Sequence, residues 1–362
     1  MTNDLESFDN LNARSDQFLQ ILVATAMGDS LGLPFENMSK RRVRKKTKGR
    51  ISQKFLFGRG MVSDDTEHAL LTARSLMDAH GDVKVFERTL SMRLRRWLAA
   101  FPPGVGKATL LSIACMWFKQ PLACGRPSAG NGPLMRAPVI GLFYNQDQAL
   151  RDAFVKTSTL MTHSDPRALF MASGIADIVA QSSRTSLEWP EMSRLFRAAA
   201  QRHATPTDEK HVKELDGLLD HLDDAHNLSI GIDTALLAIG CKRGVDGYAY
   251  RSALASAYIA SKPVDANQAS ENIILQGGDT DSTAALTAAL CAASGRHFSR
   301  TCMHTIRDWP VSQQYLERHA QGLAAIRPCQ IQEPVYLKQL ARNLGLFWVA
   351  VFHIAKSWLP PY

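Results

Sequence analysis

The sequence predicts an all-α protein that folds as one compact domain. Apolar residues recur at spacings of three and four in one segment after another, and the high Ala, Leu and Met content of these segments favours helix over strand. No segment shows the sustained apolar and polar alternation of a half-buried strand. Clear helical patterns run over residues 18–27, 66–79, 85–101, 107–118, 147–161, 167–181 and 282–293.

Loops rich in glycine and proline separate these segments. Residues 57–63 precede the second pattern, residues 102–106 separate the third from the fourth, and residues 121–133 follow the fourth. Asp246-Gly247 is the nearest approach to a hairpin turn, but a helical pattern follows it directly. We find no internal repeat or low-complexity linker, so we expect one domain over residues 16–362, preceded by an extension over residues 1–15.

Composition places the chain among folded soluble proteins. Of its 362 residues 45% are apolar and 21% are charged. The six cysteines form no C-x-x-C pair, and the acidic start of the chain is unlike a signal peptide. No apolar run approaches the roughly 20 residues that a membrane span needs. These features predict a cytoplasmic protein without a membrane segment.

The net charge of +8 comes from a single segment. Eight of the eleven residues 40–50 are basic, and without them 34 basic residues balance 34 acidic ones. A nucleic-acid-binding face usually spreads its charge over several elements, so nucleic acid is an unlikely partner. A block of like charge is more often a solvated loop or an interaction tail.

Three segments rich in aspartate carry the chemistry, and we expect each at the N-terminal edge of a helix. They are residues 28–36 with Asp29, residues 63–66 with Asp64 and Asp65, and residues 277–282 with Asp279 and Asp281. Short oxygen-bearing side chains among glycines suit hard divalent cations, which also relieve the repulsion between converging carboxylates. The alternative is that these aspartates only cap helices.

The same segments resemble the ADP-ribosylglycohydrolase family, in order, from about residue 18 to about residue 300. The Ser63-Asp64-Asp65-Thr66 segment and the Gly277-Gly278-Asp279-Thr280-Asp281-Ser282 segment are the most specific part. The Gly-Asn-Gly-x-x-Met-Arg segment at 130–136 is nearly as specific, whereas Thr162-His163 and Gly247-Tyr248 are weak alone. The resemblance implies an orthogonal helical bundle that hydrolyses the bond between C1″ of ADP-ribose and a side chain.

The resemblance also implies a site for two metal ions, magnesium or manganese. By position, the ligands are Ser63, Asp64, Asp65, Asp279, Asp281 and Ser282, with Asp65 and Asp279 also acting in catalysis. Two such ions orient a water and make it nucleophilic near neutral pH. Glu36 matches a family glutamate near the metals and is expected to act as acid, base or gate; its alternative is a solvated loop residue. Asp29 is either a partner behind the ligands or a cap.

Substrate contacts are less specific. Asn131 and Gly132 are expected to let the backbone approach ADP-ribose, although a simple loop-to-helix turn explains them too. His163 is either a substrate contact or a core histidine, and Tyr248 either stacks on adenine or packs in the core. Gly277 and Gly278 complete the expected substrate-binding set.

Two functions from different classes remain compatible with these residues. The first, which the resemblance implies, is an enzyme that removes ADP-ribose from a modified protein, with arginine as the expected acceptor. The second is an immunity protein that neutralises an ADP-ribosyltransferase toxin by docking, with or without hydrolysis, through residues 1–15 or 40–50. A degenerate scaffold is less compatible, because all six ligand positions carry oxygen donors.

Overall fold

Two central helices, α1 (Thr2–Gly32) and α14 (Thr280–Ala293), organise the fold of the computed structural model, which describes residues 2–55, 58–328 and 330–358. From Phe18 to Leu31 every residue of α1 is buried, as expected of a helix that is apolar all round. A Cβ on Gly28 would lie 2.3 Å from the carbonyl oxygen of Ala284. Gly28 therefore allows the backbones of α1 and α14 to touch.

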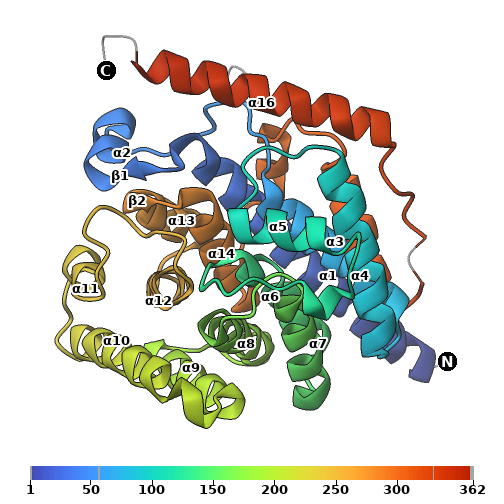
Figure 1. Ribbon diagram of the computed structural model, residues 1–362, viewed down its shortest axis with the longest axis horizontal. Helices are drawn as coiled ribbons and strands as arrows, with labels where there is room; N and C mark the ends of the chain where they lie inside the picture. The colour runs from blue at the N-terminus through green and yellow to red at the C-terminus, as the bar shows by residue number, and fades with distance from the viewer. Residues whose placement is uncertain (1, 56–57, 329, 359–362) are drawn as a thin grey trace.

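The other helices pack around this pair (Figure 1). In chain order the remaining elements are η1 (Leu33–Phe35), β1 (Met38–Ser39), α2 (Lys40–Thr47), α3 (Asp64–Ala79), α4 (Val83–Ala99), α5 (Lys107–Cys115), η2 (Pro121–Ala123), η3 (Gly132–Met135), α6 (Ala137–Phe143), α7 (Gln148–Leu160), α8 (Pro166–Ser182), α9 (Trp189–His203), η4 (Pro206–Asp208), α10 (Glu209–Asn227), α11 (Ile232–Ala238), α12 (Ala249–Ala260), α13 (Ala266–Ile274), β2 (Gly277–Gly278), η5 (Arg300–Thr305), α15 (Gln313–Ala325) and α16 (Tyr336–Trp358).

The all-α class is confirmed. Each of the seven predicted helical patterns falls on a helix: α1, α3, α4, α5, α7, α8 and α14 in turn. Within the described residues the only strands are β1 and β2, which pair antiparallel with Met38 opposite Gly278 and Ser39 opposite Gly277. A ladder of two residues is too short to leave an alternating pattern in the sequence.

The first aspartate segment does not open a helix, contrary to expectation. Residues 28–32 are the last turn of α1, and Asp29 lies inside that helix. The helix continues through Gly28 and Gly32 because both face α14, where a Cβ on Gly32 would lie 2.2 Å from the carbonyl oxygen of Thr280. The other two segments do begin helices: Ser63 is the N-cap of α3 and Asp279 that of α14.

The N-terminal extension is continuous with α1. Residues 2–15 form the first half of this helix, and the Arg14 guanidinium lies 5.8 Å from the ring centroid of Phe18 and 5.7 Å from that of Phe143. The side chains of Leu5 and Phe8 lie outside the described part, whereas Leu11 is partly exposed. Contrary to the sequence-based expectation, the stretch Asn10–Phe35 is long and apolar enough to cross a membrane, but 94% of its most apolar window is buried. It forms part of the protein core.

The basic segment is a helix and not a solvated loop. Val43 and Thr47 of α2 are buried one turn apart. On the same spacing, Lys40 and Arg44 both pair with Asp233, at 2.8 Å each. These contacts hold α2 against the start of α11.

Two cysteines pair, which the spacing of the thiols did not predict. Cys115 at the end of α5 and Cys124 after η2 form a disulfide across nine residues. Cys241, Cys291 and Cys302 are free thiols, and Cys329 lies outside the described residues.

Candidate metal centre

Three helix ends bring carboxylates together at the centre of the molecule. Asp29 comes from the last turn of α1, Asp65 from the first turn of α3, and Asp281 from the first turn of α14. One oxygen from each lies within 4.8 Å of the others, and all three side chains are buried. Helix N-termini favour anions, so α3 and α14 partly stabilise this charge.

Asp29 orients the α3 end of the cluster. Its carboxylate accepts hydrogen bonds from the backbone N–H of Ser63, at 2.9 and 3.0 Å, and from the backbone N–H of Thr66, at 3.2 Å. Burial raises the pKa of Asp29 to about 6, although these hydrogen bonds lower it. Of the two roles expected for Asp29, the contacts therefore match that of a partner behind the ligand loop.

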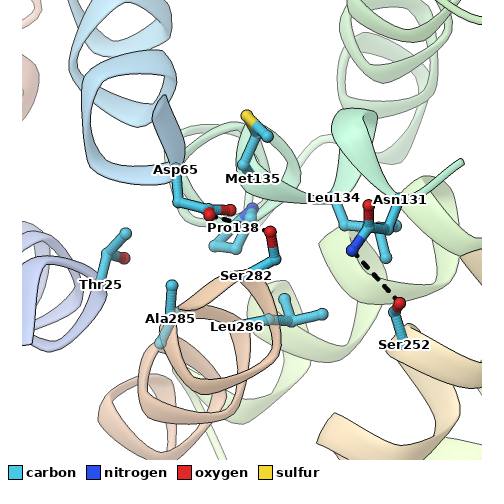
Figure 2. Close-up of a pocket in the computed structure, with 11 residues that line it drawn as sticks. Thr25, Asp65, Asn131, Leu134, Met135, Pro138, Ser252, Ser282, Ala285 and Leu286 are labelled. Atoms are coloured by element: carbon cyan, nitrogen blue, oxygen red, sulfur yellow. Dashed lines mark hydrogen bonds between the residues drawn. The ribbon is translucent and has the colours of Figure 1, made fainter. Parts of the chain in front are cut away.

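Asp65 joins α3 to α14 (Figure 2). Its Oδ2 accepts hydrogen bonds from the Ser282 hydroxyl at 2.9 Å and from the Ser63 hydroxyl at 3.3 Å. A cavity lined by Asp65, Ser282 and mostly apolar side chains is about 10 Å³ in volume, no larger than one water needs. Asp65 thus lies on the closed side of the cluster.

The carboxylates of Asp64, Asp279 and Asp281 lie on the open side. Burial raises the pKa of Asp64 and Asp281 well above the usual range, and neighbouring carboxylates raise it further. Burial and the neighbouring carboxylates raise the pKa of Asp65 as well. Asp281 Oδ1 is buried and accepts no hydrogen bond from any described residue.

This arrangement fits a divalent cation. Like charges that converge in a buried site are costly, and a cation removes that cost while giving an orphaned oxygen such as Asp281 Oδ1 a partner. The donors are carboxylates and hydroxyls, the ligands that magnesium and manganese prefer. The six expected ligands, Ser63, Asp64, Asp65, Asp279, Asp281 and Ser282, all carry such oxygens. Of these, Asp65 and Asp281 lie in the 4.8 Å cluster, where the third carboxylate is that of Asp29.

A cleft of about 860 Å³ is lined by Asp281 of this cluster and by the neighbouring carboxylates of Asp64 and Asp279. Its lining comes from β1, the loop before α5, the loop before η3, the loop after α11 and the start of α14. Among the residues expected in the site, those that line it are Glu36, Asp64, Asn131, Gly132, His163, Gly278, Asp279, Asp281 and Ser282. Ser63, Asp65, Tyr248 and Gly277 are not among its lining residues.

Glu36 ends η1 and is partly buried at the cleft wall. Burial and the charge of Asp279 raise its pKa to about 7, while a hydrogen bond from Asn37 opposes the shift. A carboxyl group with this pKa exists in both protonation states near neutral pH, as acid–base catalysis requires.

Asn131, Gly132 and His163 form one wall of the cleft. The Asn131 amide donates to Asp279 Oδ2 at 2.8 Å and so fixes that carboxylate. A Cβ on Gly132 would lie 2.9 Å from the His163 ring, so close packing against His163 explains why this position is a glycine. Burial, followed by the charge of Arg136, lowers the pKa of His163 to about 3, so the ring is neutral at physiological pH.

Tyr248 and Gly277 do not line the cleft, but both contact residues that support its walls. The Tyr248 hydroxyl donates to Glu214 at 2.6 Å, and guanidinium groups lie over its ring, Arg251 at 4.7 Å and Arg167 at 5.6 Å. Gly277 has a φ of +72°, and its Cβ would lie 2.6 Å from the backbone nitrogen of Lys40. It allows β2 to pair with β1 beside the cleft.

Comparison with known proteins agrees with this geometry. The model of the ADP-ribosylglycohydrolase family matches residues 10–325. The chain belongs to the ADP-ribosylglycohydrolase family. No curated protein matches the sequence. A solved structure titled "ADP-ribosylglycohydrolase-related protein complex" is similar to the chain, with a TM-score of 0.63 and 20% identity over 87% of this chain and 99% of that one.

Membership in this family makes the chain a hydrolase that acts on ADP-ribose conjugates, with the family's all-α fold. The family match ends at residue 325, so α16 lies beyond it. Because the match covers all three aspartate segments, the carboxylate cluster lies wholly within the family region.

The sequence did not predict three basic residues that line the cleft. Lys107 begins α5, and Lys242 and Arg243 lie in the loop after α11; all three are exposed and line the cleft. No described acidic side chain forms an ion pair with them. These basic residues lie outside any recognisable motif, so only the fold shows that they line the same cleft as the carboxylates.

Proposed function

We propose that the protein removes ADP-ribose from arginine side chains of modified proteins, with two magnesium ions bound at the carboxylate cluster. Manganese is the alternative metal. The observation that supports this proposal best is the convergence of α1, α3 and α14, which brings three buried carboxylates together, one of them, Asp281, on the wall of an 860 Å³ cleft. A cleft of this volume matches a nucleotide-sized ligand.

The ligands in this proposal are Ser63, Asp64, Asp65, Asp279, Asp281 and Ser282. Bound metal ions supply positive charge that orients and polarises water beside the sugar. Asn131 holds the Asp279 carboxylate through its amide, and Asp29 holds the Ser63 backbone. These contacts fix the positions of two ligands before substrate binds.

Glu36 is the proposed proton donor. Hydrolysis breaks the bond between C1″ and the guanidine nitrogen, joins the water oxygen to C1″, and leaves a nitrogen that needs a proton. Burial at the cleft wall, the largest cause of the raised pKa of Glu36, favours the protonated carboxyl group that supplies this proton. Glu36 lines the cleft with Asp279 and Asp281, so its proton is near the reacting bond in this proposal.

The choice of arginine rests on charge as well as on family resemblance. The carboxylates of Glu36 and Asp64 line the cleft, and a guanidinium group is a cation at every physiological pH. Serine-linked and DNA-linked ADP-ribose offer no such charge. The basic residues Lys107, Lys242 and Arg243 suit the anionic diphosphate of the same substrate.

The test uses arginine-, serine- and DNA-linked ADP-ribose, each incubated with the purified protein in magnesium or in a chelator. We expect free ADP-ribose from the arginine-linked substrate in magnesium, and little release in chelator. Release of AMP would instead identify attack on the pyrophosphate. Full activity in chelator would contradict the role of the metal.

Docking on an ADP-ribosyltransferase toxin is the second candidate. It is supported by the basic segment 40–50, in which Arg41, Lys45 and Lys48 are exposed, and which directly follows the cleft-lining residues of β1. Residues 1–15 are the other proposed docking segment. An experiment in chelator distinguishes the two candidates. If the protein binds and neutralises the toxin there without releasing ADP-ribose, the result supports docking alone.

A further inference from the structure

The C-terminal helix α16 reaches the proposed metal site through one side chain. Arg342 has only 7% of its side chain exposed. Its Nη2 donates to the backbone carbonyl of Val62 at 2.7 Å, and its Nη1 donates to Glu67 at 3.0 Å. Val62 precedes Ser63, and Glu67 follows Asp65 by two residues. Arg342 therefore holds both ends of the ligand segment.

Asp308 completes this contact. It accepts from Arg342 Nε at 2.8 Å and also accepts the backbone N–H of Val62 at 3.0 Å. Its side chain is fully buried. Burial lowers the pKa of Arg342, but the carboxylates of Glu67 and Asp308 outweigh it and raise the pKa, so the guanidinium stays charged. One guanidinium thus joins a carbonyl and two buried carboxylates in a fixed fork.

The remaining contacts of α16 fix its position along the molecule. Asn343 donates to the carbonyl of Ala100 at 2.8 Å, and Leu346 packs with Phe55 and Met61. Figure 1 shows α16 lying along one edge of the molecule. Because the family match ends at residue 325, this support for the ligand segment comes from a part of the chain that the family match does not include.

We propose that Arg342 is a positioning residue for the metal centre, which it serves by holding the backbone on both sides of Ser63, Asp64 and Asp65. This inference rests on the metal site of the proposed function. Residues behind metal ligands set their orientation, and the loss of such a residue typically lowers metal affinity about 10- to 100-fold.

The test compares Arg342→Lys with Arg74→Lys in the full-length protein. Arg74 is an equally buried arginine of α3, with 1% exposed, that anchors the C-terminal segment through the carbonyls of Ile331 and Gln332 and through Glu333. Both variants keep the charge and lose the fork. Only Arg342 contacts the ligand segment, so the pair separates positioning from general anchoring.

The readout is the affinity for Mg²⁺ alone, which is measured by titration calorimetry and by the rise in melting temperature on adding Mg²⁺. We expect Arg342→Lys to weaken Mg²⁺ binding about tenfold or more, and Arg74→Lys to leave it unchanged. Equal Mg²⁺ affinity in Arg342→Lys and wild type, or an equal loss in both variants, overturns the proposal.

A second variant covers the case in which Arg342→Lys does not fold. The double variant Arg342→Gln with Glu67→Gln removes the cation together with one of its carboxylates, and so leaves less unpaired buried charge. We expect it to fold and to bind Mg²⁺ weakly, and wild-type affinity in this variant would also overturn the proposal. If wild-type protein itself binds no Mg²⁺, the proposed function fails, which is a separate outcome.

Discussion

At the scale of single residues, the buried carboxylates of the cluster repel one another, and this repulsion lowers the stability of the folded protein. Asp29, Asp65 and Asp281 are buried within 4.8 Å of one another, and no described cation pairs with them. Buried carboxylates elsewhere in the protein have a basic partner, as Asp308 has Arg342. Unpaired buried charge of this kind is typical of functional sites, where another group supplies the missing partner.

Asp281→Asn tests this cost directly. The substitution removes a buried negative charge whose Oδ1 has no hydrogen-bond donor among the described residues. In chelator at pH 8, we expect the free energy of unfolding to rise, because burial and the nearby carboxylates of Glu36, Asp279 and Asp65 disfavour the charged form of Asp281. Hydrolysis in magnesium should fall more than about 100-fold, since a direct ligand is lost. Urea unfolding and a rate assay measure the two effects.

The matched control is Asp233→Asn. Asp233 is about half exposed and pairs with Lys40 and Arg44, so its loss should slightly lower stability and leave hydrolysis unchanged. If both variants change stability in the same direction, the argument from buried repulsion is wrong.

At the scale of elements, the helices were predictable and the place of Asp29 was not. The seven patterns of period 3.6 fell on helices because their apolar faces pack on the core. Gly28 and Gly32 misled the prediction, because glycines next to an aspartate usually indicate a loop. In α1 they instead allow close contact with the backbone of α14, a tertiary reason that leaves no local signal.

Gly28→Ala should loosen the junction of α1 and α14. The new Cβ would lie 2.3 Å from the carbonyl oxygen of Ala284 and 2.8 Å from the Cα of Ala285, so one backbone must shift. We expect a loss of stability of about 1–3 kcal/mol. The shift also moves Asp29, so Mg²⁺ affinity should fall with it. Thermal unfolding and calorimetry measure both quantities.

Gly217→Ala is the control for Gly28→Ala, because an added Cβ at Gly217 meets no neighbour. Gly217 is an exposed residue within α10, and its Cβ would meet nothing within 4 Å. Alanine there should stabilise the protein by about 0.4–1 kcal/mol, because it restricts the unfolded chain and favours helix. A loss of stability at Gly217 equal to that at Gly28 would mean that close packing is not the cause.

At the scale of the whole molecule, the cleft depends on contacts between distant parts of the chain. Glu36, Lys107, Asn131, His163 and Asp279 line it from five separate segments. Motif order and family resemblance indicated four of them, because those residues lie in recognisable segments. Lys107 has no motif around it, and the contact from Arg342 to the ligand segment spans 280 residues. Such positions follow only from the packed fold.

The final prediction concerns how pH and magnesium act together on the whole protein. The pKa of Asp29 in the folded state is about 6 and that of Glu36 about 7, both above their ordinary values. The folded state therefore holds more protons than the unfolded state, and this contribution to stability is lost as pH rises through these values. For fully buried Asp29 alone, the shift corresponds to about 3 kcal/mol. Metal-free protein should thus lose stability between pH 5 and pH 8.

Magnesium should cancel this loss, because it replaces the protons at the cluster. We therefore expect the rise in melting temperature caused by Mg²⁺ to be larger at pH 8 than at pH 5, measured by scanning calorimetry with chelator as reference. Asp65→Asn is the control, since its cluster holds one charge less and the difference between the two pH values should shrink. A magnesium effect of equal size at both pH values in wild-type protein would show that protons and metal do not compete for the same carboxylates.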